Sequence, residues 1–223
     1  MAYMVPPGLE DLAQLDKVLV KQHIEFLEVF LGCEMNNKYS LKNSMDQEFL
    51  QAKENTDCCS RNCCGPMRAF EMALINSQEQ EIIHLSRPYT CIHCCWPCCL
   101  QRLEVSCPPG TPLGSVHQEW GFCTPIAAKF SVRNVSGDTV FIIQGPVCTM
   151  SCGSDVVFKI LSEDGSDQVG NITKLWRGCC SEVLTDAENF SITFPMELEV
   201  RIKALLVGAA FLIDFMYFEK QRD

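Results

Sequence analysis

The stretch Ala204-Leu-Leu-Val-Gly-Ala-Ala-Phe-Leu-Ile213 is apolar throughout, and Asp214 and Phe215-Met-Tyr-Phe218 follow it directly. As a helix, these roughly fifteen residues would extend about 22 Å. A helix that crosses a membrane needs about 20 residues, and Asp214 would cost a few kcal/mol in lipid. A helix that is apolar on all sides lies either in a protein core or in a membrane. The pattern therefore leaves both descriptions open.

The chain upstream of this stretch has the pattern of a mainly β protein. Short runs alternate polar and apolar residues, and turn sequences such as Ser136-Gly137-Asp138 and Asp164-Gly165 separate them. Many short strands at regular spacing predict an antiparallel sheet, sandwich or barrel. Residues 9–31 fit either a helix or a pair of strands. The clearest strand runs are 69–74, 81–85, 100–105, 128–132, 139–143, 156–161 and 191–194.

The composition excludes some classes of protein. The 223 residues carry a formal net charge of −10, whereas sequence-independent nucleic-acid binding needs a basic surface. Sixteen cysteines would suit a secreted disulfide scaffold, but residues 1–16 lack the pattern of a signal peptide. Adjacent cysteines such as Cys58-Cys59 rarely bond to each other. We therefore expect a cytosolic chain with reduced thiols.

The densest group of cysteines permits two kinds of chemistry. Cys91-x-x-Cys94 and Cys95-x-x-Cys98 have the spacing of zinc ligands, with His93 between them. Cytosolic thiols beside Trp96, Pro97 and Leu100 also suit fatty acylation at a membrane surface. From the residues alone, zinc binding and acylation stay open.

Several segments together resemble the phospholipid scramblase family, and the resemblance runs from Pro6 to Glu219. The family ordinarily has a further cysteine where Trp96 stands. The segments that carry the resemblance are Pro6-Pro7-Gly8-Leu9-Glu10, Asn37-Lys38-Tyr39, Cys94-Cys95-Trp96-Pro97-Cys98-Cys99-Leu100-Gln101, Thr185-Asp186-Ala187-Glu188-Asn189-Phe190, Phe194-Pro195 and the ending Phe211-Leu212-Ile213-Asp214-Phe215-Met216-Tyr217-Phe218-Glu219.

The resemblance implies a mainly β, tubby-like fold, in which a closed antiparallel β-barrel surrounds a hydrophobic C-terminal helix. On this reading, 1–36 is an N-terminal segment, 37–203 is the barrel and 204–219 is the helix. The helix is either the barrel core or a single membrane span. Its membrane-helix candidates are Ala204, Leu205, Leu206, Val207, Phe211, Leu212, Ile213, Asp214 and Phe215.

The resemblance also implies a calcium site and an acylated cysteine block. Compared with a twelve-residue calcium loop, the segment starting at Asp186 has Phe190 at a ligand position and no glycine at the sixth. We expect weak Ca²⁺ binding by Asp186, Glu188 and Glu197, helped by backbone carbonyls in a segment that includes Phe190 and Ile192. Favoured by the resemblance over zinc, palmitoylation is expected at Cys94, Cys95, Cys98 and Cys99.

The family resemblance implies a non-enzymatic protein that moves phospholipids between leaflets in response to calcium. It would lie at the cytoplasmic face of the plasma membrane, with membrane phospholipids as partners and homo-oligomers as an option. Residues 170–178 occupy the place of the family's nuclear import segment; we favour a plain strand and turn there, with weak importin binding and a nuclear location when not acylated as the alternative. Since only Pro6-Pro7 remains of the family's proline-rich tail, SH3 and WW partners are not expected. The rival functions are an acylated adaptor and a zinc-stabilised regulatory protein.

Overall fold

The computed structural model describes residues 5–23, 36–56, 68–90, 100–120, 128–147, 154–176 and 188–218, with the side chains of residues 188 and 189 excepted. Two helices, a terminal π-helical turn and twelve strands lie within these ranges. They are α1 (Glu10–Ala13), β1 (Lys17–His23), β2 (Lys38–Lys42), β3 (Glu48–Asn55), β4 (Phe70–Ile75), β5 (Glu81–Arg87), β6 (Arg102–Cys107), β7 (Thr111–Gln118), β8 (Lys129–Asn134), β9 (Thr139–Gln144), β10 (Val156–Ser162), β11 (Gln168–Lys174), β12 (Glu188–Thr193), α4 (Val200–Ile213) and η3 (Asp214–Phe218).

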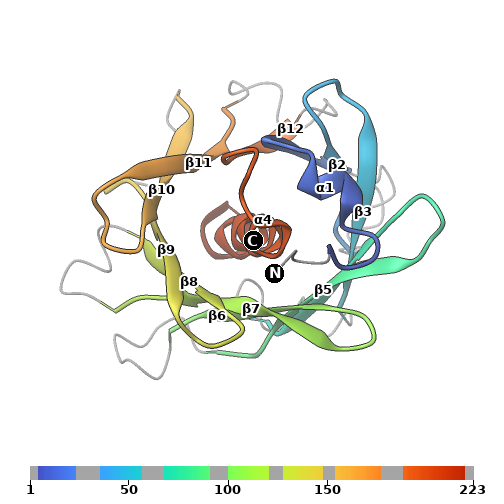
Figure 1. The fold of residues 1–223 in the computed structure, drawn as a ribbon, viewed down its shortest axis with the longest axis horizontal. Coiled ribbons are helices and arrows are strands. Elements are labelled where there is room, and N and C mark those ends of the chain that lie inside the picture. The colour runs from blue at the N-terminus through green and yellow to red at the C-terminus, as the bar shows by residue number, and fades with distance from the viewer. Residues whose placement is uncertain are drawn as a thin grey trace, which may run out of the picture.

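The strands form one closed barrel. Each strand pairs antiparallel with its neighbours along the chain, and β1 pairs with β12 to close the ring. Figure 1 looks along the barrel and shows α4 end-on at its centre. Closure leaves no exposed sheet edge on which another chain could add a strand. The prediction of a mainly β fold, with a closed antiparallel barrel around a C-terminal helix, is confirmed.

The barrel wall alternates between buried and exposed side chains. In β10, Val156, Phe158 and Ile160 are buried, whereas Val157 and Lys159 are exposed. This alternation is what the polar and apolar runs of the sequence predicted. In the ambiguous segment 9–31, the described part holds the single turn α1 and then β1. The barrel therefore includes residues from the segment 1–36 that the sequence analysis set apart.

Two of the short hairpins, β2–β3 and β4–β5, share one turn design. The side chain of Asn43 accepts hydrogen bonds from the backbone N–H groups of Met45 and Gln47, at 2.9 and 3.0 Å. Asn76 makes the same pair of contacts in the β4–β5 hairpin. The third residue after each asparagine, Asp46 or Glu79, has a positive φ. Asparagine side chains stabilise such turns by replacing a backbone acceptor.

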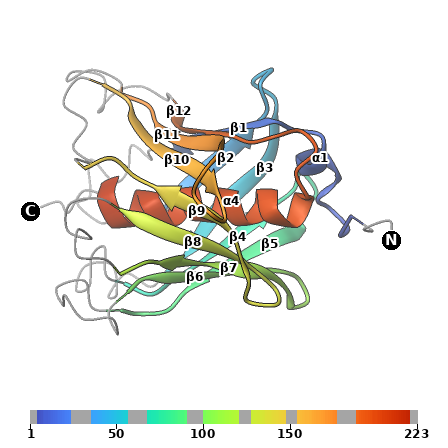
Figure 2. The same cartoon turned by 60° about the vertical axis from the view of Figure 1, so that its left-hand side comes forward.

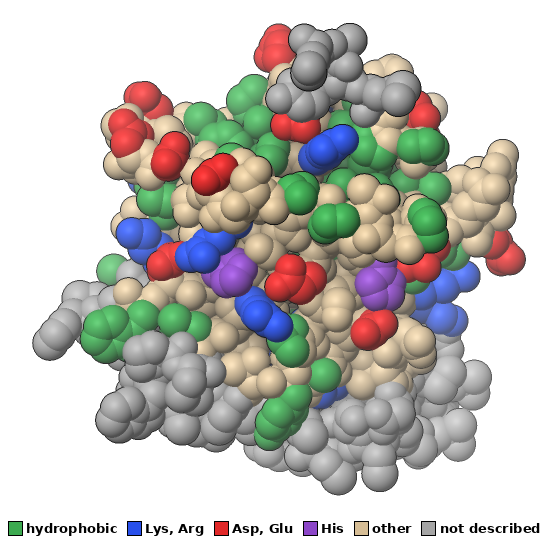
Figure 3. Space-filling model, turned by 60° about the horizontal axis from the view of Figure 1, so that its bottom comes forward, with side chains coloured by type: hydrophobic (Ala, Val, Ile, Leu, Met, Phe, Trp, Pro, Cys, Tyr) green, Lys and Arg blue, Asp and Glu red, His purple; other side chains and the backbone are tan. Residues whose placement is uncertain are grey.

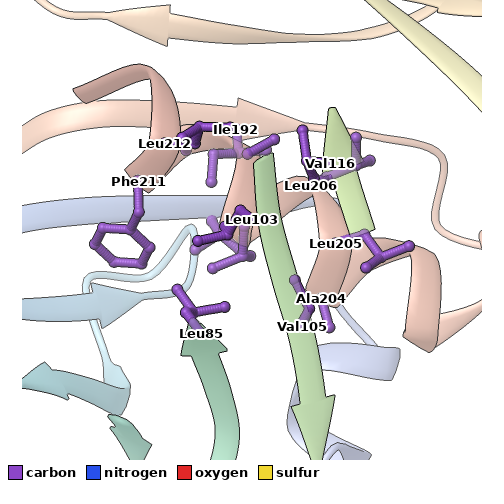
Figure 4. Packing of buried hydrophobic residues seen from close by; sticks show 14 of the residues in the cluster. Leu85, Leu103, Val105, Val116, Ile192, Ala204, Leu205, Leu206, Phe211 and Leu212 are labelled. Carbon is purple, nitrogen blue, oxygen red and sulfur yellow. The ribbon is translucent and has the colours of Figure 1, made fainter. Parts of the chain in front are cut away.

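Helix α4 is the core of the barrel. All of its residues except Arg201 are buried, and Figure 2 shows the helix running along the barrel interior. Leu205, Leu206 and Leu212 pack against residues of β6, β7 and β12 in Figure 4. Each fully buried leucine contributes about 2 kcal/mol to folding. Of the two descriptions that the sequence left open, the structure supports the barrel core.

A membrane-spanning helix was the other description of this segment. Within the described ranges, no helix combines the length and apolar character that a membrane crossing requires. The expectation of a transmembrane helix is therefore corrected. Because α4 is surrounded by twelve strands, its uniformly apolar surface contacts side chains of the barrel wall.

The two ends of the barrel differ in how the strands are connected. Strands β1, β3, β5, β7, β9 and β11 all end at one end of the barrel, because neighbouring strands are antiparallel. The connections there are long, such as the one from Arg87 to Arg102. We call this the long-connection end. At the short-turn end, tight hairpins join β2 to β3, β4 to β5, β6 to β7, β8 to β9 and β10 to β11.

Candidate functional site

The C-terminal end of the central helix lies at the long-connection end and is held there by polar contacts. The carboxylate of Asp214 accepts a hydrogen bond from the Tyr39 hydroxyl at 3.1 Å and one from Lys174 Nζ at 3.3 Å. The Lys174 ammonium lies 4.4 Å from the ring centre of Phe190 and 5.2 Å from that of Phe218. Cation–π contacts of this kind stabilise the position of the ammonium. Asp214 thus connects η3 to β2 and β11.

Buried ionic and polar groups surround the same end of the helix. Arg68 donates to Glu54 Oε1 through Nε at 2.9 Å and through Nη2 at 2.8 Å, and both side chains are almost fully buried. The Asn37 amide donates to the other oxygen of Glu54 at 2.7 Å. Arg87 donates twice to Gln101 Oε1, at 3.0 and 2.7 Å. Since breaking a buried pair by removing one partner costs about 3–5 kcal/mol, these contacts fix the long-connection end in one arrangement.

Aromatic packing completes this end of the interior. Phe215 stacks on Phe70 with ring centres 4.3 Å apart. The Tyr217 ring packs at 6.4 Å from Phe130 and 6.2 Å from Phe158. Burial raises the pKa of Tyr217 to about 12, so its phenol is neutral at physiological pH and brings no negative charge to the site.

Exposed aromatic side chains gather at the long-connection end. Tyr89 follows β5 and is 61% exposed, Trp120 follows β7 and is 54% exposed, and Trp176 follows β11 and is 40% exposed. Val147, which follows β9, is also exposed. In the part of the chain that the structure describes, the large exposed hydrophobic side chains near the short-turn end are valines and methionines. We call Tyr89, Trp120 and Trp176 the aromatic rim.

The short-turn end of the helix is closed by one lysine. Lys203 is buried, and its ammonium donates to the backbone carbonyls of Ala13, Leu15 and Met196 at 2.8, 2.6 and 2.8 Å. An ammonium has three donors, so this group is fully satisfied. Burial lowers the pKa of Lys203. The arrangement is structural and leaves no group available for a ligand.

The predicted calcium residues lie at both ends of the barrel. Asp186 is outside the described residues, and the backbone of Glu188 begins β12 at the long-connection end. Glu197 is exposed in the segment between β12 and α4, at the short-turn end. Strand β12 separates the two glutamates by roughly 17 Å, whereas calcium ligands lie about 2.4 Å from the ion. One ion bound by both Glu188 and Glu197 does not fit this geometry.

The side chains of Phe190 and Ile192 are buried inside the barrel. They contribute to the core, and their backbone atoms take part in the pairing of β12 with β1 and β11. Among the residues with described side chains, no three histidine, cysteine, aspartate or glutamate groups are placed to hold a metal ion. The predicted calcium ligand set is thus not brought together within the described chain.

Most of the predicted cysteine chemistry falls outside the described residues. Cys91, Cys94, Cys95, Cys98 and Cys99 all lie there, so neither the palmitoylation site nor the zinc alternative has a described geometry. The connection that contains them leaves the barrel at Thr90 and returns at Leu100, at the long-connection end. Cys107 is buried, as expected of a small hydrophobe, and burial raises the pKa of its thiol.

The segment that resembles a nuclear import signal is partly a barrel strand. Residues 170–174 belong to β11, and Lys174 is bound to Asp214. Trp176 lies beyond the strand, where its backbone N–H donates to Asp155 at 2.8 Å. The prediction of a plain strand is confirmed for the described part of this segment. Importin binding stays a prediction, and it would have to compete with the Lys174 contacts.

Sequence reasoning missed Glu54, Arg68 and Arg87, and it named Gln101 only as the end of the family-like cysteine block. Nothing in their local sequence marks them as buried, because charged residues at strand ends are usually exposed. Tyr39 was noticed only within the family-like run Asn37-Lys38-Tyr39. The exposed Tyr89 carried a usable signal, since it stands in the connection that follows the strand run 81–85.

The geometry defines the class of protein, which is a closed antiparallel barrel whose core is an apolar C-terminal helix. The scramblase family model matches residues 1–220. The chain is 51% identical over 214 residues to phospholipid scramblase 1 of Homo sapiens, covering 96% of this chain and 66% of that protein. It is 49% identical over 217 residues to phospholipid scramblase 2 of Bos taurus, covering 97% and 73%.

A more distant relative agrees with these two. Phospholipid scramblase family member 5 of Homo sapiens is 40% identical over 215 residues, which cover 96% of this chain and 78% of that protein. The chain thus spans about two thirds to three quarters of the length of these relatives. It belongs to the scramblase family.

Proposed function

We propose that this protein docks onto a membrane by its long-connection end and moves phospholipids between leaflets without covalent chemistry. The observation that carries the docking is the aromatic rim. Tryptophan and tyrosine are enriched at membrane–water interfaces, where their amphipathic rings lie at the level of the headgroups. Tyr89, Trp120 and Trp176 are exposed together at one end of the barrel.

The proposed anchor is a set of fatty-acylated cysteines near this rim. Cys94, Cys95, Cys98 and Cys99 lie in the connection that joins Thr90 to Leu100. A single acyl chain gives only reversible binding, whereas two or more hold firmly. Acylation there would place the rim against the cytoplasmic face of the plasma membrane. A form that is not acylated would be free to enter the nucleus.

The lipid movement itself is inferred from the family. The relatives are named phospholipid scramblases, which supports membrane phospholipids as the partners. The activity that we propose is ATP-independent, bidirectional transfer. A closed barrel with a filled core offers no lipid path through the described interior. We therefore place the transfer at the outer surface of the rim, with homo-oligomers or local bilayer distortion as the means.

For calcium, we propose a smaller set of ligands than the sequence predicted. Because Glu197 lies at the short-turn end, we restrict the proposed calcium site to Asp186 and Glu188 at the start of β12. Few carboxylates around the ion predict weak binding. No step of the lipid transfer is derived from calcium.

A reconstitution experiment tests the proposed activity. The purified protein is placed in liposomes with a fluorescent lipid in both leaflets, and dithionite bleaching is followed with and without calcium, beside Asp186→Ala. We expect calcium-stimulated bleaching beyond the outer leaflet, and loss of the calcium stimulation in the variant. Bleaching that stops at the outer leaflet under all conditions would overturn scrambling by this chain alone.

A second experiment tests the docking end. Trp120→Ser combined with Trp176→Ser should weaken flotation with phosphatidylcholine vesicles by about tenfold or more, because each exposed aromatic contributes apolar area to the interface. The matched control is Met45→Ser combined with Val135→Ser, which removes exposed apolar side chains at the short-turn end. Equal losses in both double variants would contradict the assignment of the rim as the membrane-facing end.

A second candidate function is supported by the buried helix. Since α4 fills the barrel, the chain also fits an acylated adaptor whose outer surface binds partners. This adaptor would bind vesicles through the same rim and yet leave inner-leaflet lipid unbleached. The dithionite experiment therefore separates the two functions.

The anchor chemistry has its own test. Hydroxylamine cleaves thioesters, so release of the cell-derived protein from membranes by hydroxylamine indicates acylation of the Cys94–Cys99 block. Release or unfolding by a metal chelator would instead indicate the zinc alternative at Cys91, Cys94, Cys95 and Cys98.

A further inference from the structure

Two residues of the aromatic rim follow nearby strands of the barrel, and the third lies apart from them. Tyr89 follows β5 and Trp120 follows β7, and only β6 separates these two strands. Since neighbouring strands lie about 4.8 Å apart, the ends of β5 and β7 are roughly 10 Å from each other. Trp176 follows β11, four strands further along the ring from β7. The rim therefore consists of a pair and a single residue.

A buried polar residue lies between the two connections that carry this pair. Gln101 stands just before β6. Its side-chain oxygen accepts both hydrogen bonds from Arg87, the last residue of β5, at 3.0 and 2.7 Å. Its side-chain amide donates to the carbonyl oxygen of Thr90 over a longer distance, 3.4 Å. These contacts hold the residues on both sides of Tyr89 against Gln101.

The backbone of Gln101 holds the other connection. Its N–H donates to Gln118 Oε1 at 3.0 Å, and its carbonyl oxygen accepts from the Gln118 N–H at 2.8 Å. Gln118 is the last residue of β7 and precedes Trp120 by two positions. Between them, the Glu119 N–H donates to the carbonyl oxygen of Lys129 in β8 at 2.8 Å. The chain that leads to Trp120 is thus bound on both sides where it leaves the wall.

Arg87, Gln101 and Gln118 together form a hydrogen-bonded group that we call the β5–β7 clamp. The core supports this clamp from inside. The guanidinium carbon of Arg87 lies 5.7 Å from the ring centre of Phe70, which in turn stacks on Phe215 of η3. Residues that are held by packing and by hydrogen bonds of their neighbours keep a more precise geometry than residues on an unsupported connection.

A separate contact positions Trp176. Its backbone N–H donates to the Asp155 carboxylate at 2.8 Å. Asp155 lies just before β10, which is three strands from β7 in the ring. A change in the β5–β7 clamp should therefore leave Trp176 in place, and this residue serves as an internal control.

The outer wall beside the clamp carries charged side chains. Figure 3 brings forward the part of the barrel that contains β5, β6 and β7 and shows acidic and basic side chains mixed around two histidines. Charged side chains are costly to place in lipid. Contact between this side of the barrel and a membrane is therefore expected from Tyr89 and Trp120, at its end.

We propose that the β5–β7 clamp positions Tyr89 and Trp120 for entry into the membrane interface, with Gln101 as its central residue. The inference rests on the proposed docking through the aromatic rim and names residues that set the geometry of that docking. Ordering a side chain at an interface costs free energy, and this cost is smaller when the backbone that carries the side chain is already fixed. The clamp residues act by positioning the two rings and need no contact with lipid themselves.

The first test measures which tryptophans enter a vesicle. One background keeps Trp120 alone, through Trp96→Phe and Trp176→Phe, and the other keeps Trp176 alone, through Trp96→Phe and Trp120→Phe. Brominated phosphatidylcholine quenches a tryptophan that reaches the bilayer interface, so we expect quenching in both backgrounds. Gln118→Met removes the acceptor for the Gln101 N–H. It should reduce the quenching of Trp120 and leave that of Trp176 unchanged.

The affinity for phosphatidylcholine vesicles should fall in parallel. We expect a loss of about threefold in Gln118→Met, which corresponds to roughly 25 Å² of apolar contact. The matched control is Gln118→Glu, whose carboxylate keeps an acceptor for the Gln101 N–H and should restore both the quenching and the affinity. Unchanged quenching of Trp120 in Gln118→Met, or an equal loss in the two variants, would overturn positioning through this contact.

A second pair of variants tests the side chain of Gln101. The reporter is Tyr89→Trp in a chain whose three tryptophans are replaced by phenylalanine. Gln101→Met removes the acceptor for Arg87 and should reduce quenching of the reporter, whereas Gln101→Glu keeps this acceptor and should retain more of it. Neither variant should alter Trp120, because that connection is held by the backbone of Gln101. Equal quenching of the reporter in Gln101→Met and in the parent would overturn the role of this side chain.

A measurement without vesicles separates this inference from the docking proposal. Time-resolved fluorescence anisotropy of Trp120 in solution follows its motion on the nanosecond scale. Gln118→Met should increase the local motion, and Gln118→Glu should not. Unchanged motion in Gln118→Met would overturn the clamp, whether or not the rim docks. Increased motion, together with no quenching of either tryptophan in the parent, would instead overturn the docking and, with it, the purpose proposed for the clamp.

Discussion

The two ends of α4 are both buried, but they are held in different ways. At the short-turn end, Lys203 gives its three donors to three backbone carbonyls at 2.6–2.8 Å. At the long-connection end, Asp214 is shared between Tyr39 and Lys174 at 3.1 and 3.3 Å, and Lys174 is 20% exposed. At the short-turn end, the Lys203 ammonium donates only to backbone carbonyls. At the long-connection end, the Asp214 carboxylate depends on side chains, and one of these, Lys174, reaches the surface.

From this difference we infer that the two ends of the barrel have different roles, one in stability and the other in function. The short-turn end has tight hairpins and a closed hydrogen-bond arrangement, which suits a stable base. The long-connection end carries the aromatic rim and the connection with the candidate acylated cysteines. Functional groups commonly lie on connections that a rigid scaffold positions. The predictions below test this division, from the largest expected effect to the smallest.

Lys203→Met should be the most damaging change. It leaves the carbonyls of Ala13, Leu15 and Met196 without their donor, and each buried unsatisfied group costs about 1–3 kcal/mol. We expect the free energy of unfolding in urea to fall by about 4 kcal/mol. Lys159→Met on the outer wall is the control and should change it by less than about 0.5 kcal/mol. A small effect of Lys203→Met would contradict the stabilising role given to the three Lys203 hydrogen bonds at the short-turn end.

Gly208→Leu tests the packing between the two ends. A Cβ at this position would already lie 3.1 Å from Leu103 Cδ2 and from Val105 Cγ2. A leucine therefore overpacks the core and should lower the free energy of unfolding by about 3 kcal/mol. Gly208→Ala should have a smaller effect, which gives a graded series. In a membrane-spanning helix, leucine would instead be favourable, so unchanged or increased stability would count against the barrel core.

Asp214→Asn should have a moderate effect. The amide keeps an acceptor for the Tyr39 hydroxyl but loses the charge that pairs with Lys174. Because Lys174 is partly exposed, solvent screens this pair, and we expect a loss of about 1 kcal/mol. A double-mutant cycle with Lys174→Met isolates the interaction. A coupling free energy near zero would show that the contact does not hold the helix end.

His117→Gln should have the smallest effect, visible only in the pH profile. Burial, and secondarily Arg133, lowers the pKa of His117 in the folded protein. The unfolded chain therefore binds this proton more readily, and stability falls as pH drops below about 6.5. The variant should flatten this part of the profile, as followed by urea unfolding at several pH values. An unchanged slope would assign the loss of stability to other groups.

The sequence predicted strands such as β10, in which polar and apolar residues alternate, and it missed β7. Strand β7 contains Pro112 and Gly114, which lower strand propensity; pairing with β6 and β8 stabilises it nevertheless. The location of the helix could not be derived from its own residues. A uniformly apolar stretch has the same pattern in a barrel core and in lipid, and only the surrounding strands distinguish the two.

The candidate site was predictable only in part. The cysteine block and the acidic residues near Asp186 could be read as motifs along the chain. The contacts of Asp214 with Tyr39 and Lys174 could not, because these residues are far apart in sequence and meet only in the folded barrel. Calcium binding by Glu197 stays a prediction, and the linear twelve-residue spacing behind it does not take account of strand β12, which separates Glu188 from Glu197.

The central claim is that α4 is the core on which the barrel depends. Amide hydrogen exchange, followed in increasing urea on the vesicle-bound protein, tests it most directly. Residues 204–213 should exchange with the same opening free energy as β6 and β7, because helix and wall unfold together. Helix amides that stay protected after those strands have exchanged would contradict the account and indicate a helix held by lipid.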